Sequence, residues 1–145
     1  FSPNLLCQNA VETMREHNRK PGVEVLLRTS VNDDVMVKSD MQVVRKVMNH
    51  LLDNAIKYTD EGEVLLNCME KDGFIRFEVS DTGRGIEPEW RKHIFEPMVI
   101  TSGSAKTSGM DLAICNAIAR LLDGKIWLDE TYENGSRFIF EIPKE

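Results

Sequence analysis

Four short blocks follow one another along this chain of 145 residues: 54–58 (NAIKY), 81–86 (DTGRGI), 95–97 (FEP) and 108–114 (SGMDLAI). The first is expected at the end of a helix, the second directly after a strand, and the fourth at the start of another helix. Each block alone is common, since Asp-Thr-Gly is also an ordinary turn sequence. In this order they together indicate a nucleotide pocket, and they decide which fold the rest of the chain should build.

The first block ends the best-supported helix of the sequence. Asp40 is a suitable N-cap, and the helix should run to about Tyr58. Its apolar residues recur at helical spacing: Val44, Val47, Met48, Leu51, Leu52 and Ala55. A second helix is expected to open at the fourth block and to close at Asp123-Gly124, with a face made of Met110, Ala113, Ile114, Ala117, Ile118 and Leu121.

The second block follows one arm of a predicted hairpin. Segments 64–69 and 74–80 flank Asp72-Gly73, and in the second segment Ile75, Phe77 and Val79 alternate with polar residues. Further strands are expected at 23–27, 125–129 and 137–142, with a weaker one at 35–37. Because helices and strands interleave without strict alternation, the pattern predicts an α/β fold with a mixed sheet covered on one face by helices.

Three smaller elements complete the expected fold. The chain opens in an amphipathic helix, with Leu5, Leu6, Val11 and Met14 as its apolar residues, and 20–22 (KPG) ends it. Pro88 suits the first turn of a short helix through Ile94, and residues 98–107 form a polar loop. The abrupt start suggests that residues 1–145 are a single domain cut from a longer protein.

Composition is that of an ordinary globular domain, with 41% hydrophobic and 29% charged residues. The net charge of −6 and the lack of a basic stripe argue against a nucleic-acid or anionic-membrane partner. Three cysteines, Cys7, Cys68 and Cys115, are widely spaced and form no zinc motif, so packing in a reduced, cytosolic protein is the simple interpretation. No apolar run approaches the ~18 residues that span a bilayer, and no signal peptide is recognisable.

The four blocks resemble the N, G1, F and G2 boxes of the ATP-binding catalytic domain (HATPase_c) of bacterial two-component sensor histidine kinases. This domain belongs to the GHKL superfamily, which also contains gyrase B, Hsp90 and MutL, and the resemblance covers nearly the whole chain. It implies a two-layer sandwich of the Bergerat type, with a mixed, mostly antiparallel sheet of about five strands. It also implies ATP and Mg²⁺ as cofactors, and a γ-phosphate donated to a histidine on helices outside this chain.

The N box carries the expected metal ligand. Helix geometry places Asn54 inside the apolar arc, where a carboxamide needs a partner. That partner is either backbone in the core or a ligand. The resemblance makes Asn54 the Mg²⁺ ligand, Lys57 a phosphate contact and Tyr58 a neighbour of the adenine or ribose.

The G1 box carries the expected base contact. Asp81 ends a strand, and the glycines after it should expose its carboxylate and let a ligand approach the backbone. In the resemblance Asp81 accepts a hydrogen bond from the exocyclic amine of adenine, which selects ATP over GTP. Gly83 and Gly85 leave room for the base and ribose, and Ile86 packs nearby. Arg84 is equally compatible with solvent or with phosphate.

The last two boxes are less regular. Phe95 and Pro97 would anchor the loop over the nucleotide or simply pack in the core. The family's last box reads Gly-x-Gly-Leu-Gly-Leu, whereas 107–112 here read TSGMDL. Ser108 and Asp111 match a capping box, which would place a carboxylate at the phosphate site. In the milder alternative Asp111 turns aside, and the triphosphate is held by Lys106, Ser108 and Gly109. The resemblance also implies Met110 and Leu112 as nucleotide-binding residues.

The predicted function is therefore that of the ATP-binding half of a histidine kinase, with no catalytic base within this chain. Its partners would be the phosphoacceptor and dimerisation helices of the same kinase and a response regulator receiver domain. It would lie in the cytoplasm, below an inner-membrane parent, without touching the membrane itself. The alternative is a degenerate docking module with weak or no nucleotide binding. A gyrase-like or MutL-like ATPase is disfavoured, because the helix between Met41 and Tyr58 contains no glutamate to activate water.

Overall fold

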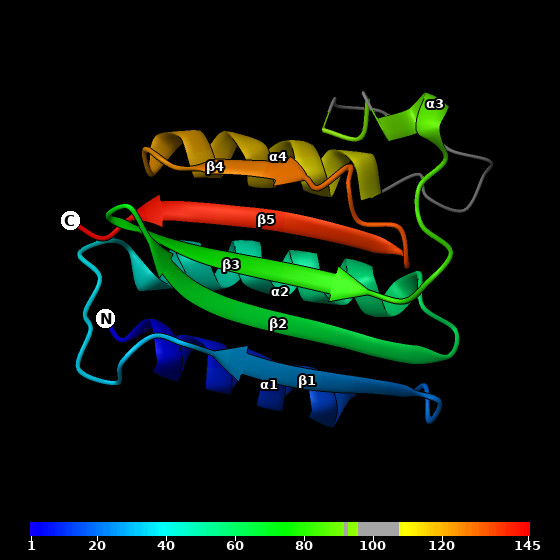
Figure 1. Ribbon diagram of the computed structural model, residues 1–145, viewed down its shortest axis with the longest axis horizontal. Helices are drawn as coiled ribbons and strands as arrows, with labels where there is room; N and C mark the ends of the chain where they lie inside the picture. Colours follow the sequence, from blue (N-terminus) through cyan, green and yellow to red (C-terminus); the bar gives the residue numbers. More distant parts are fainter. Residues whose placement is uncertain (92, 96–107) are drawn as a thin grey trace.

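A five-stranded sheet forms one layer of the protein, and helices form the other (Figure 1). The computed structural model describes residues 1–91, 93–95 and 108–145, without the side chains of Trp90 and of residues 108–111. The elements are α1 (Pro3–His17), β1 (Val23–Thr29), α2 (Met41–Lys57), β2 (Gly62–Lys71), β3 (Phe74–Asp81), α3 (Pro88–Arg91), α4 (Ser108–Leu121), β4 (Lys125–Leu128) and β5 (Ser136–Pro143).

The sheet is mixed, as the sequence pattern predicts. Its strand order is β1-β2-β3-β5-β4; β1 and β2 are parallel, and every other neighbouring pair is antiparallel. Helices α1, α2 and α4 cover one face of this sheet (Figure 1). At the β2–β3 hairpin, Asp72 and Gly73 have φ values of 54° and 84°, which confirms the expected tight turn.

Helix α2 is the central helix of its layer, and its expected N-cap and buried face are confirmed. Asp40 accepts hydrogen bonds from the backbone N–H groups of Gln42 and Val43, so it is the N-cap. All six apolar residues expected on its inner face are buried: Val44, Val47, Met48, Leu51, Leu52 and Ala55. They pack on the strand residues that point inward, Ile75, Phe77, Val79, Phe138, Phe140 and Ile142.

The expected face of α4 is wrong at Ile114, Ala117 and Leu121, whereas Ile118 does pack against the core and the Met110 side chain lies outside the described residues. Its buried side chains are Leu112, Cys115 and Ala119, whereas Ile114 and Leu121 are 45% and 83% exposed. Apolar residues occur almost all the way around this helix, so periodicity alone has no clear phase. Packing against α2 and β4 selects the side that is buried.

Other boundaries also differ from expectation. Residues 35–37 form no strand, because the backbone of Val37 pairs with Phe1 and that of Lys38 with Lys144 instead of with a sheet neighbour. Leu5 is 57% exposed, and Cys7 and Ala10 take its place in the core. The first helix ends at His17, before the KPG turn, and α3 ends at Arg91, short of Ile94.

All three cysteines are buried in the core as thiols outside any disulfide, which confirms their packing role. Although distant in sequence, Cys7 on α1 and Cys68 on β2 meet in the core. The hydrogen bond to Cys68, together with burial, raises the pKa of the Cys7 thiol far above its ordinary range. A thiol held neutral in this way is a poor nucleophile.

Reaction of the three thiols with Ellman's reagent is therefore expected to need local or global unfolding. Since such opening is expected to cost about 4 kcal/mol or more, the native rate should be at least about a thousandfold below that of the unfolded chain. The measurement compares thiol release with and without denaturant, using a short cysteine peptide as control. Immediate titration of any thiol in the folded protein would contradict the observed burial.

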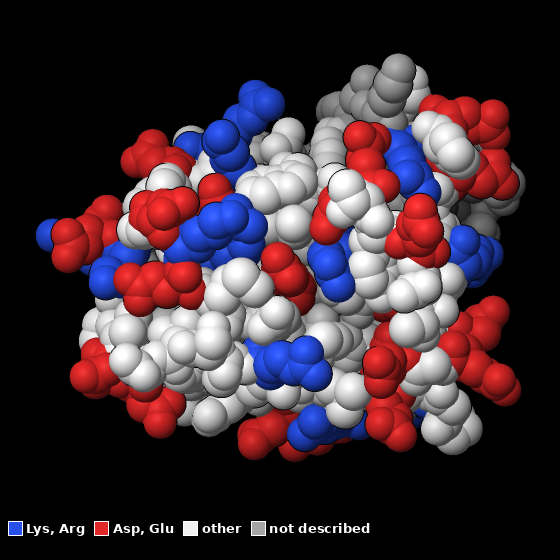
Figure 2. All heavy atoms as spheres, viewed as in Figure 1, with Lys and Arg blue, Asp and Glu red and all other residues white. Residues whose placement is uncertain are grey.

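Lys and Arg are interspersed with Asp and Glu on the face of the sheet that Figure 2 shows. Several of them form ion pairs, among them Arg76 with Glu141 at 3.0 Å and Lys144 with Glu70 at 3.0 Å. This face therefore presents no field of one sign. Within the described ranges, no helix is both long and apolar enough to cross a bilayer.

Candidate nucleotide site

The expected site elements meet at one end of the molecule. The carboxyl ends of α2 and β3, the amino end of α4 and the short helix α3 all lie there (Figure 1). The chain folds this way because α2 and β3 run in the same direction along the two layers, while α4 runs in the opposite direction. Residues from positions 54 to 136 are thereby gathered at one end.

Asp81, the last residue of β3, is the chemical centre of this end. Its Oδ1 accepts hydrogen bonds from the backbone N–H groups of Gly83 at 3.0 Å and Ser136 at 3.1 Å. Within the part of the chain that the structure describes, Oδ2 accepts none. The carboxylate is buried, with only 4% of the residue exposed, which corrects the expectation of an exposed group.

Burial raises the pKa of the Asp81 carboxyl, and the two backbone N–H donors partly oppose this shift. The group is thus anchored through one oxygen at the base of the site. Its second oxygen remains available to a hydrogen-bond donor. A carboxylate oxygen that no described group engages, on a residue that is only 4% exposed, favours a ligand that supplies an N–H group.

The turn before β5 contributes residues that sequence reasoning missed. Gly135 lies directly against Asp81: a Cβ added to Gly135 would stand 2.1 Å from the Asp81 carbonyl oxygen. Ser136 follows with its N–H on the carboxylate, and the Tyr132 hydroxyl donates to the same Asp81 carbonyl at 3.1 Å. The signal was available as Asn134-Gly135, but it indicates a turn and does not specify what the turn touches.

Arg137 holds this turn in place. Its guanidinium lies over the ring of Tyr132, 4.2 Å from the centroid, and pairs with Asp129 at 3.6 Å. Its Nε donates to the Ser80 hydroxyl at 2.8 Å, next to Asp81 in β3. The β4–β5 connection is therefore fixed to the strand that carries the carboxylate.

Gly83 is required for close packing. A Cβ at this position would lie 2.3 Å from the Tyr58 carbonyl oxygen and 2.9 Å from the Thr59 hydroxyl oxygen. The G1 turn thus rests directly on the carboxyl end of α2. Gly85 has a φ of 72°, which favours glycine, and it faces the carbonyl of Gly135.

Three side chains lie beside the G1 turn, those of Arg84, Ile86 and Phe95. Arg84, for which the sequence left solvent and phosphate open, lies over the Tyr58 ring at 5.2 Å from its centroid. Ile86 and Phe95 pack against the core, and the Phe95 ring meets that of Phe138 edge-on at 6.0 Å. The core-anchor interpretation of Phe95 is confirmed, while Pro97 lies outside the described residues.

Two side chains of the N box, those of Asn54 and Lys57, are accessible to a ligand. Asn54 is half-buried, and its carboxamide forms no hydrogen bond with any described residue. Lys57 is exposed and forms no ion pair within the described ranges. A half-buried carboxamide oxygen without a partner suits Mg²⁺, which prefers oxygen ligands and uses few from the protein. Among the described residues no cluster of three or more His, Cys, Asp or Glu could hold a metal by itself.

The last box can be followed only in its backbone. Helix α4 begins at Ser108, so Ser108, Gly109, Met110 and Asp111 occupy its first turn. Their side chains and Lys106 lie outside the described part of the chain, and the capping-box hypothesis stays a prediction. Leu112 is 5% exposed and packs in the core, so its assignment to the nucleotide site also stays a prediction.

Residues 39–145 match the model of the family described as histidine kinase-, DNA gyrase B- and HSP90-like ATPases. The match covers all the site residues named above. The chain belongs to this family. Among curated members of the family, it is 32% identical to the sensor protein TorS of Escherichia coli over 99% of the chain. It is 36% identical to the peroxide stress-activated histidine kinase mak2 of Schizosaccharomyces pombe over 77% of the chain.

Solved structures of the ATPase family agree with the fold. The catalytic domain of the histidine kinase ThkA superposes with a TM-score of 0.86 at 32% identity, covering 99% of this chain and 95% of that one. Full-length ShkA in complex with AMPPNP gives 0.85 at 29% identity, covering 99% and 30%. ThkA bound to the response regulator TrrA gives 0.83 at 33%, covering 100% and 41%. The chain is thus a histidine-kinase-type ATPase domain, and it spans 16% of the length of TorS and 5% of mak2.

Proposed function

We propose that this domain binds Mg²⁺-ATP at the end of the molecule formed by α2, β3 and α4. It then presents the γ-phosphate to a histidine on a separate helix. The observation that carries the proposal is Asp81, a buried carboxylate anchored through Oδ1 with Oδ2 unpartnered among the described residues. The exocyclic amine of adenine supplies the missing donor, whereas guanine presents a carbonyl oxygen at the equivalent position.

The remaining residues take complementary parts. The Asn54 carboxamide oxygen would hold the metal, which when bound neutralises charge on the phosphates. Lys57, exposed at the same end of α2, would contact a phosphate. Tyr58, with Arg84 over its ring, would form the side of the adenine or ribose pocket. The free N–H groups at the start of α4 would face the phosphates, where Ser108, Gly109 and Lys106 complete the site.

In phosphoryl transfer the protein mainly positions the groups and stabilises charge. The residues named above bind and orient ATP, and none of them is placed to remove a proton from the acceptor. The acceptor histidine, its assisting base and the dimerisation helices would lie in other parts of a kinase. The small share of TorS and mak2 that this chain spans supports this division.

A response regulator receiver domain is the proposed downstream partner, supported by the ThkA structure solved with the response regulator TrrA. We place the domain in the cytoplasm, where ATP is available, as the catalytic part of a parent sensor at the inner membrane. Isolated, it should bind nucleotide without phosphorylating itself.

Calorimetry of this chain with ATP is expected to show Mg²⁺-dependent binding, with GTP at least about tenfold weaker, because a donor to Asp81 is lost. The matched variant is Asp111→Gly, which restores a glycine to the last box and removes a carboxylate from the phosphate end. It should bind ATP at least as tightly as the natural chain.

Binding by the variant alone would mean that Asp111 closes the phosphate site, and the natural chain would then be a regulatory docking module. Loss of binding in both, with circular dichroism showing folded protein, would overturn the assignment of Asn54 and Asp81. Equal affinity for GTP would overturn the role of Asp81 alone.

A further inference from the structure

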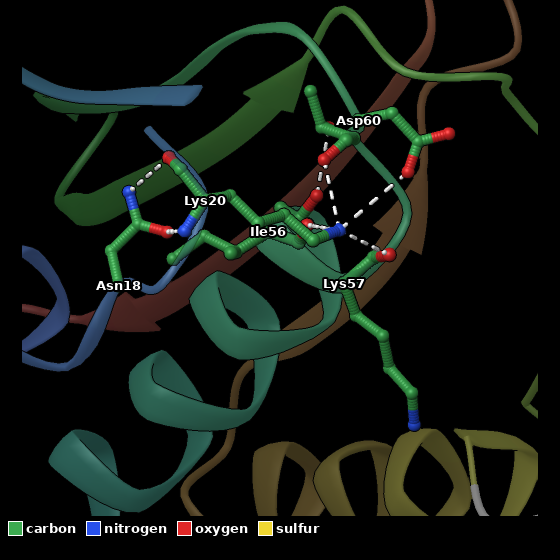
Figure 3. A network of polar contacts seen from close by, with 7 residues as sticks. Asn18, Lys20, Ile56, Lys57 and Asp60 are labelled. Carbon is green, nitrogen blue, oxygen red and sulfur yellow. Dashed lines mark hydrogen bonds and ion pairs between the residues drawn. The ribbon is translucent and has the colours of Figure 1, made fainter. Parts of the chain in front are cut away.

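Lys20 closes the carboxyl end of α2 from another part of the chain. Its ammonium donates hydrogen bonds to the carbonyl oxygens of Ile56 at 2.9 Å, Lys57 at 3.0 Å and Thr59 at 3.0 Å (Figure 3). Asp60 adds a longer ion pair at 3.7 Å. An ammonium has three N–H donors, and the last carbonyls of a helix lack intrahelical partners. The geometry therefore satisfies donor and acceptors together, at the negative end of the helix dipole.

The connection that carries Lys20 is itself ordered. The Asn18 side chain accepts from the Lys20 N–H at 3.0 Å and donates to the carbonyls of Lys20 and Val23. These bonds fold residues 18–23 around the Asn18 carboxamide, and Figure 3 shows those that join Asn18 and Lys20. The lysine is thus presented to α2 by a fixed turn, which makes it a built contact and not a chance surface pair.

The end of α2 that Lys20 holds is the part that supports the nucleotide site. Tyr58 and Thr59 form the surface on which Gly83 rests, at separations that leave no room for a Cβ. Thr59 is completely buried, and its hydroxyl donates to the Ala55 carbonyl at 2.8 Å. Gly83 in turn donates its N–H to Asp81. A continuous set of contacts therefore runs from the Lys20 ammonium to the carboxylate.

We infer that Lys20 is a positioning residue for nucleotide binding. By holding the carbonyls of the last turn of α2, it sets the place of Tyr58 and of the G1 turn relative to Asp81. Figure 3 shows the Lys57 side chain pointing away from Lys20, so Lys57 remains available to a phosphate while Lys20 holds its backbone. The inference rests on the proposed ATP site, and it adds a residue that lies outside all four boxes.

The test compares Lys20→Met with Lys144→Met in this chain. Lys144 is a matched control: its side chain is 33% exposed against 34% for Lys20, and it also pairs with a carboxylate, that of Glu70, away from α2. Mg²⁺-ATP affinity is measured by calorimetry at a temperature where circular dichroism shows every variant folded. Lys20→Met is expected to raise Kd about tenfold, equivalent to ~1.4 kcal/mol, and Lys144→Met less than about twofold.

Two further readouts separate positioning from stability. In ¹⁵N-labelled protein without nucleotide, the amide resonances of Tyr58, Thr59 and Gly83 should move in Lys20→Met and stay in place in Lys144→Met. Lys20→Arg keeps a cationic donor and should restore Kd to within about threefold of the natural chain.

Each outcome bears on the inference. Unchanged ATP affinity in folded Lys20→Met, with a natural chain that binds ATP, overturns the positioning role and leaves the proposed function intact. An equal loss of ATP affinity in both methionine variants would mean that the lost positive charge, and not the contact with α2, causes the effect. This result would also overturn the positioning role of Lys20. A natural chain that does not bind ATP overturns the proposed function, and the inference with it.

Discussion

Asp81→Asn is expected to abolish ATP binding, raising Kd by about 100-fold or more, while the domain stays folded. Because Oδ1 already accepts from Gly83 and Ser136, the asparagine oxygen must keep that place. Its NH₂ group then occupies the position of Oδ2. A donor would face the donor amine of adenine, so the substitution replaces an attraction with a repulsion.

Calorimetry with Mg²⁺-ATP measures this effect. Asp72→Asn is a suitable control, because Asp72 is exposed in the β2–β3 turn, at the opposite end of β3 from Asp81. An Asp81→Asn protein that binds ATP with a Kd near that of the natural chain would show that adenine does not contact this carboxyl.

Asp81→Asn should also raise the free energy of unfolding at neutral pH. The direction of this change follows from the pKa of Asp81. Burial raises the folded-state pKa of Asp81 above its ordinary value of 3.8. The carboxyl therefore adds to the free energy of unfolding while it is protonated. This contribution is complete at pH values below the pKa of Asp81 in the unfolded chain, and it is lost as the pH rises through the pKa of Asp81 in the folded protein. At pH 7 the natural protein holds an ionised buried group, which asparagine removes.

Thermal unfolding by circular dichroism at pH 7 and at pH 4 checks this sign. The melting temperature of Asp81→Asn should exceed that of the natural chain at pH 7, and the difference should shrink toward pH 4. A difference that instead grows on acidification would show that the backbone donors outweigh burial at this carboxyl.

Gly135→Ala is expected to destabilise the domain by about 3 kcal/mol and to weaken ATP binding in what remains folded. The residue has a φ of 152°, and an added Cβ would collide with the Asp81 carbonyl oxygen at 2.1 Å and with Oδ1 at 2.8 Å. The turn must then withdraw from β3, and with it the Ser136 N–H that holds the carboxylate. Urea unfolding measures the stability, and calorimetry the affinity.

Gly73→Ala is the matched control for this substitution. Gly73 also has a positive φ, 84°, but no atom lies within 4 Å of its ideal Cβ. Its cost should therefore be limited to backbone strain, about 1 kcal/mol, with no change in ATP affinity. Equal costs for the two substitutions would mean that the contact between Gly135 and Asp81 relaxes easily.

The expected chemistry of the site came from short local patterns. Asp40, the α2 apolar face and the Asp72-Gly73 turn are confirmed because capping, helical burial and left-handed turns depend on residues within a few positions of one another. The family resemblance rested on such blocks as well, and the match over residues 39–145 confirms it. The face of α4 was wrong for the opposite reason, since only packing chooses among nearly equivalent apolar sides.

The sequence by itself determined the type of fold, the family and the identity of Asp81 as the central polar residue. Tertiary structure decided the rest: that Asp81 is buried, that Gly135 and Ser136 hold it, and that Lys20 closes the helix beneath it. These contacts join residues 36 to 55 positions apart. A local pattern can specify a turn or a helix cap. A hydrogen bond between residues far apart in the sequence is determined only when the two layers pack and bring the donor and the acceptor together.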